Sequence, residues 1–231
     1  MAREGYREDL ADLRRSVLAL GADVVAQLDD GVDALVEGDE QLGEAVADGD
    51  AAVNERYLAL ESDCIDLFAL QQPVASDLRF VAASFKILTD LERVGDLAAN
   101  LGQYARTGGS RGDPGWSRLD TAEVRAIGDE TVALVEAALS AYDREDVDAC
   151  RRVAERDDEV DTLCQRAGER VVRDLIGEEV AAGDAWGAET LMEDVSRALL
   201  TVRDLERVGD HAVNVAARTL YMVDNDPSLI Y

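Results

Sequence analysis

The sequence predicts an all-α protein of six long antiparallel helices, which form two tandem three-helix bundles related by internal duplication. Apolar residues recur at spacings of three or four along most of the 231 residues, which is typical of amphipathic helices. No alternating pattern typical of strands competes with it. The heptapeptide DLERVGD at positions 90–96 recurs at 204–210, in the third helix of each predicted set. Repetition at equivalent places indicates a tandem duplication.

The first half, residues 1–107, contains three apolar stripes. The first stripe runs from Leu10 to Leu35, and the second runs from Val46 to Leu67. The third begins beyond Pro73 and runs from Leu78 to Leu101. A single amphipathic helix cannot bury its own stripe, so these three helices are expected to pack as one antiparallel bundle.

The second half, residues 118–231, repeats this plan after a linker predicted at 108–117. The linker falls in the stretch TGGSRGDPGW, whose glycines and proline disfavour a helix. Three further stripes follow at 124–138, 153–175 and 191–216. The sequence leaves open whether the two bundles lie side by side or end to end.

Composition limits the classes of partner. The chain has 50 Asp and Glu against 23 Lys and Arg, a formal net charge of -27. Such a field repels nucleic acid and anionic lipid headgroups, so no nucleic acid is expected as a partner. This acidic balance, with Lys86 as the one lysine, resembles that of halophilic archaea. The apolar runs are interrupted by charges and the first residues are not a signal peptide, so a cytoplasmic location is expected.

The cysteines are expected to be reduced core residues. Cys64, Cys150 and Cys164 cannot all pair within one chain, and each falls in an apolar helical stretch. A disulfide frame is therefore not predicted.

The repeated heptapeptide contains acids that are unfavourable on an isolated helix. Carboxylates four residues apart repel by a few tenths of a kcal/mol, and a glycine in mid-helix costs about 1 kcal/mol relative to alanine. Both penalties occur twice, which suggests a compensating bound cation or a close approach of another backbone. Two ladders of residues four apart are predicted: Glu92, Asp96 and Asn100, and Glu206, Asp210 and Asn214.

The second helix of each half carries further oxygen ligands. Asp50 and Asn54 lie beside the apolar stripe of the first half, and Asp157 and Asp161 lie at the equivalent place in the second. If the second and third helices pack together, each pair can face the ladder opposite. Four oxygen-bearing side chains from two helices suit hard or borderline cations.

Two alternatives follow from the same residues. In a metal-free helical scaffold, accessory to another phosphate or ion transporter, the acids are a solvated surface and Arg93 or Arg207 neutralises its neighbours. In a carboxylate-metal enzyme, the clusters carry chemistry. Such enzymes usually use Glu-x-x-His pairs, whereas this chain has only one histidine, His211. His211 is expected to point away from the acids of its ladder.

The sequence resembles the PhoU family over roughly Tyr6 to Val223. The resemblance rests on both copies of DLERVGD and on the segment QQPVASDLRFVAASFKILTDLERVGD at 71–96. It implies two three-helix bundles that bind surface clusters of iron or zinc, or of manganese or magnesium, through acidic pairs. It also implies a non-enzymatic negative regulator of the high-affinity phosphate ABC transporter, acting in phosphate homeostasis.

Carried over by residue, the family's metal motif matches Asp50, Glu92, Asp96, Asp157, Asp161, Glu206 and Asp210. Asn54 stands where a second carboxylate is expected, and its neutral amide oxygen is a weaker ligand. The implied partner is the transporter's ATPase subunit at the cytoplasmic face of the membrane, with a signalling kinase as a further candidate. A homodimer is left open. Asp77 and Arg79 are expected to form an ion pair or to contact a partner.

Overall fold

The computed structural model describes residues 2–107, 120–179 and 185–230, and within these ranges it has six α-helices and no strand. The all-α prediction is confirmed. The predicted linker at 108–117 lies outside the described residues, so the domain boundaries remain a prediction. The helices are α1 (Ala2–Glu37), α2 (Glu40–Gln71), α3 (Ser76–Thr107), α4 (Thr121–Arg144), α5 (Val147–Glu179) and α6 (Ala185–Asp224).

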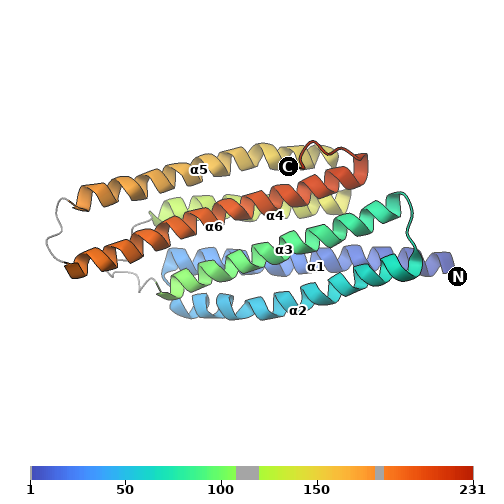
Figure 1. The fold of residues 1–231 in the computed structure, drawn as a ribbon, viewed down its shortest axis with the longest axis horizontal. Helices are drawn as coiled ribbons and strands as arrows, with labels where there is room; N and C mark the ends of the chain where they lie inside the picture. Colours follow the sequence, from blue (N-terminus) through green and yellow to red (C-terminus); the bar gives the residue numbers. More distant parts are fainter. Residues whose placement is uncertain (1, 108–119, 180–184, 231) are drawn as a thin grey trace.

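The two bundles lie side by side (Figure 1). Helices α1, α2 and α3 pack on one another as the first bundle, and α6 packs on α4 and α5 in the second. Between the bundles, α3 packs along α6 and α1 packs along α4. Fully buried leucines from both halves, such as Leu20, Leu88, Leu134 and Leu205, belong to one apolar core. The side-by-side alternative is therefore the observed one.

Aspartates begin several of the helices as N-caps. The Asp39 carboxylate accepts hydrogen bonds from the backbone N–H groups of Gln41 and Leu42 at the start of α2. Asp120 accepts one from Ala122 at the start of α4. These caps satisfy donors that the first turn of a helix leaves unpaired. The turn before Asp39 has Gly38 at a φ of 67°, the left-handed conformation common at helix ends.

Two glycines allow α1 and α4 to approach closely. A Cβ at Gly21 would lie 2.6 Å from a methyl carbon of Leu139, and one at Gly128 would lie 2.4 Å from a methyl carbon of Val32. Gly21 and Gly128 occupy equivalent positions in the two halves, as do Val32 and Leu139. Each half therefore inserts an aliphatic side chain above the other half's glycine.

All three cysteines are free and buried, which confirms the expectation of reduced core residues. Burial raises the pKa of Cys64 to about 12, of Cys150 to about 11 and of Cys164 to about 12. Nowhere in the described ranges is a helix both long enough and apolar enough to cross a membrane.

Candidate metal centre

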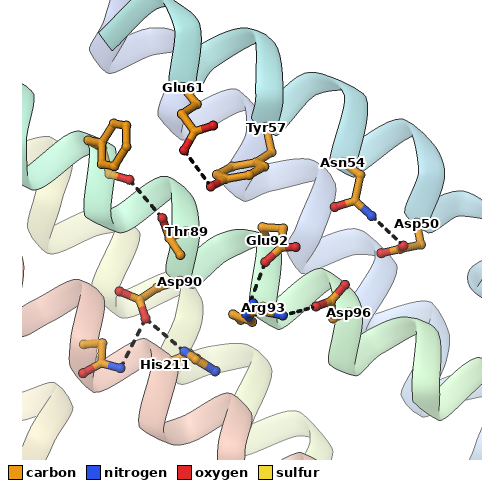
Figure 2. A network of polar contacts seen from close by, with 12 residues as sticks. Asp50, Asn54, Tyr57, Glu61, Thr89, Asp90, Glu92, Arg93, Asp96 and His211 are labelled. Carbon is orange, nitrogen blue, oxygen red and sulfur yellow. Dashed lines mark hydrogen bonds and ion pairs between the residues drawn. The ribbon is translucent and has the colours of Figure 1, made fainter. Parts of the chain in front are cut away.

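The first acidic set lies between α2 and α3 and consists of Asp50, Asn54, Glu92 and Asp96 (Figure 2). The side-chain amide of Asn54 donates a hydrogen bond of 2.8 Å to Asp50 within α2. Burial, followed by the charge of Asp96 on α3, raises the pKa of Asp50. The predicted facing of α2 and α3 is therefore observed at this set.

Arg93 supplies a positive charge to the first acidic set. Its guanidinium donates to Asp96 at 2.9 Å and lies 3.5 Å from a carboxylate oxygen of Glu92 (Figure 2). The pKa of Glu92 is raised mainly by burial and then by Asp96, while Arg93 acts in the opposite direction. Part of the repulsion between the two ladder acids is thus offset within the chain.

The second acidic set lies between α5 and α6 and consists of Asp157, Asp161, Glu206 and Asp210. Burial, followed by the charges of Asp161 and Asp210, raises the pKa of Asp157 to about 7, and Glu206 adds to the effect. Burial and the acids across the helix pair also raise the pKa of Asp161 and of Glu206. These mutual shifts place the four carboxylates in one electrostatic cluster.

No arginine or lysine in the described ranges forms an ion pair with any of these four carboxylates. Arg207, which corresponds to Arg93, is exposed. The identical heptapeptides therefore differ in their surroundings: one contains a paired arginine and the other does not.

Gly209 provides the space in which the Asp157 carboxylate lies against α6. A Cβ at position 209 would be 2.3 Å from Oδ1 of Asp157, closer than real Cβ atoms approach a neighbour. At the equivalent Gly95 the nearest atom is instead a methyl carbon of Val53, at 3.1 Å. The atoms nearest to the repeated glycine are thus those of a carboxylate side chain in the second half and of an aliphatic side chain in the first, rather than the expected backbone.

The donor chemistry of both sets fits a cation. Oδ1 of Asp50 and Oδ1 of Asp157 are each buried without a hydrogen-bond partner, which is costly unless another group or an ion satisfies them. Carboxylate and amide oxygens suit hard cations, and zinc also accepts carboxylate ligands. However, no three Asp, Glu, His or Cys side chains in the described ranges are gathered as a ready metal site. Metal binding by the eight predicted residues stays a prediction.

The first aspartate of each heptapeptide bonds across the interface between the bundles, a role that sequence reasoning missed. The buried carboxylate of Asp204 accepts hydrogen bonds from Tyr104, at 2.8 Å, and from Asn100, at 3.2 Å. The Asp90 carboxylate accepts one of 3.2 Å from Asn214. The predicted ladders were therefore wrong to include Asn100 and Asn214, because both amides reach the opposite bundle.

His211 contributes to this interface as well. Its Nδ1 lies 2.9 Å from Oδ1 of Asp90 (Figure 2), and both side chains are largely buried. The histidine points away from its own ladder, as expected. In the sequence, the signal for these contacts was an asparagine ten residues after Asp90 and another ten residues after Asp204. Its meaning depends on α3 packing antiparallel to α6, an arrangement that the sequence left open.

The expected ion pair between Asp77 and Arg79 does not form in the described part of the chain. The guanidinium of Arg79 instead donates to the backbone carbonyl of Met222 at 3.4 Å. Arg79 thereby links the start of α3 to the last turn of α6.

Comparison with known proteins agrees with this architecture. The PhoU domain family matches residues 17–105 and 124–219. The chain is 34% identical over 224 residues to the Pseudomonas aeruginosa "Phosphate-specific transport system accessory protein PhoU homolog", covering 94% of this chain and 85% of that protein.

Two crystal structures share the fold. PhoU from Pseudomonas aeruginosa has a TM-score of 0.80 at 31% identity, covering 96% of this chain and 100% of that one. The phosphate transport system regulatory protein PhoU from Streptococcus pneumoniae has a TM-score of 0.81 at 23% identity, covering 96% and 98%. The chain belongs to the PhoU family.

Proposed function

We propose that this chain is a non-enzymatic accessory protein of a phosphate-specific transport system, and that it lowers the activity of the transporter when phosphate is plentiful. The main support is the likeness to accessory proteins of that system over nearly the whole chain. The proposed partner is the ATPase subunit of a phosphate ABC transporter, contacted from the cytoplasm. A signalling kinase is a second proposed partner.

The charge of the chain constrains how it meets the membrane. A formal net charge of -27 opposes direct adsorption to anionic lipid. Attachment through the transporter, by a basic patch on that protein, is therefore the proposed route.

The proposed role includes a bound metal ion. The acidic sets fit this role because they bring facing carboxylates together and leave one buried oxygen unpaired in each half. Iron or zinc is proposed from the family likeness, with manganese or magnesium as alternatives suited to oxygen ligands. When bound, the ion would neutralise like charges and join two helices. It supplies no catalytic step in this proposal.

Uptake and capture experiments test the regulatory proposal. Cells that lack the gene should take up phosphate faster in phosphate-rich medium, and expression of the full chain should restore the lower rate. Affinity capture from phosphate-replete cells should retain the ATPase subunit of the transporter. Unchanged uptake together with no captured ATPase would refute the proposed role and favour the metal-free scaffold.

A further inference from the structure

We propose that this chain binds its cation at the second acidic set alone, because in the first set Arg93 offsets part of the charge and both Arg93 and Asn54 already donate hydrogen bonds to the acids. This inference rests on the proposed metal binding and deepens it, because it assigns the ion to one of two sets that the duplication makes equivalent. The structural differences between the sets carry the argument.

The first difference is charge. The first set has three carboxylates, from Asp50, Glu92 and Asp96, and one paired guanidinium, so its formal charge is -2. The second set has four carboxylates and, among the described residues, no paired base, so its formal charge is -4. Because a cation is attracted in proportion to the charge it meets, the second set is the stronger site.

The second difference is hydrogen bonding. In the first set the amide of Asn54 already donates to Asp50, and Arg93 already donates to Asp96. A cation that binds these two oxygens would have to displace both donors, and Oδ1 of Asp50 is the buried oxygen of the first set that stays unpaired. The exposed Arg93 pair is individually weak, but its position between two acids makes it a local competitor for them. In the second set Asp161 occupies the place of Asn54 and no such donor must leave.

The third difference is the space at the repeated glycine. Gly209 allows Oδ1 of Asp157 to lie against α6, where this oxygen, like Oδ1 of Asp50 in the first set, has no hydrogen-bond partner. Gly95 accommodates Val53 instead. The second half thus directs a carboxylate, and the first half an aliphatic side chain, towards the third helix. Only the second half positions a ligand there.

Paired variants of the full chain test the assignment. Mn²⁺, Zn²⁺ and Fe²⁺ are titrated separately, with iron under anaerobic conditions, and bound metal is measured by elemental analysis after desalting and by the shift in Tm. E206Q/D210N should weaken binding at least tenfold and abolish the Tm shift. The matched variant E92Q/D96N should bind within about twofold of the unaltered chain. Circular dichroism checks that both variants keep their helices.

A second pair tests the site without changing charge. G209A should weaken metal binding because the new methyl group displaces Asp157, whereas G95A should leave it unchanged. Equal losses in both members of either pair, or loss in the first-half variants alone, would overturn the assignment while leaving metal binding in place. No binding of any of the three metals by the unaltered chain would overturn both this inference and the metal component of the proposed function.

Discussion

Gly128 sets how closely the two bundles approach, and Gly128→Ala should separate them. The added Cβ would lie 2.4 and 2.8 Å from the two methyl carbons of Val32. Val32 is fully buried, and a valine in a helix has essentially one side-chain rotamer. The methyl groups therefore cannot rotate away, and α4 must move from α1 by about 1 Å to restore ordinary contacts of about 3.5–4.0 Å.

The expected magnitude combines two opposing effects. Overpacking a buried site costs about 1–3 kcal/mol, whereas replacing a helical glycine by alanine returns about 1 kcal/mol. Gly128→Ala should thus lower the free energy of unfolding by about 1 kcal/mol, with about 2 as the upper value. For a chain of this length each kcal/mol corresponds to about 2–4 °C in Tm.

Two further variants provide the controls. At Gly168 the nearest atom to a new Cβ is 4.0 Å away, so Gly168→Ala should stabilise the chain by about 0.5–1 kcal/mol. The stability change caused by Gly21→Ala should fall between those of Gly128→Ala and Gly168→Ala, because the Leu139 methyl groups that the new Cβ meets are at the end of a more flexible side chain. Urea denaturation followed by circular dichroism measures the series. Equal stability of the variants at positions 128 and 168 would refute the close packing of α1 on α4.

Three other predictions concern buried polar groups. Tyr104→Phe removes the 2.8 Å hydrogen bond to Asp204 and should lower the free energy of unfolding in urea by about 1.5–3 kcal/mol. The exposed control Tyr221→Phe should lower it by less than about 0.5 kcal/mol. Similar losses in the two variants would contradict the buried bond. Burial and the neighbouring acids raise the pKa of Asp157 to about 7 in the folded chain, well above the usual range of an aspartate, so the folded state takes up the extra proton. With chelator present, stability should therefore fall as pH rises from about 4 to 8, by about 1–2 kcal/mol from this group after solvent screening; a slope that persists in Asp157→Asn would assign it to other acids. Cys164 and the other two thiols, buried and with raised pKa values, should react with a thiol reagent only after unfolding, and rapid reaction of the native chain would exclude the observed burial.

Helix positions were predictable because their signals are local. The apolar stripe from Val46 to Leu67 falls within α2 and the stripe from 124 to 138 falls within α4. Aspartate caps and the proline after α2 mark where helices begin and end. Periodicity also shows which face of each helix is buried, so the facing of Asp157 towards Glu206 could be inferred. These inferences need only the chain within one bundle.

The contacts between bundles were not predictable in the same way. The stripes do not specify which helix of one bundle meets which helix of the other. Asn100 was therefore placed in its own ladder, although it reaches Asp204 on α6. The glycines at positions 21 and 128 carried no visible meaning either, because their partners lie on a helix of the opposite half.

The two copies of DLERVGD show why identical local sequence need not mean identical local chemistry. In both copies the first aspartate bonds to the other bundle, through Asn214 in one case and Asn100 in the other. The glycine and the later acids, however, depend on the helix packed against them. On α2, Asn54 and Val53 face the first heptapeptide, and the acids of that heptapeptide are paired with Arg93. On α5, Asp161 and Asp157 face the second heptapeptide, and its acids have no paired arginine among the described residues. Divergence of the second helix of each half can therefore change the charge of a site while the heptapeptide stays constant. The hydrogen bonds between the bundles use the aspartate of both copies, and they require no cation in either half.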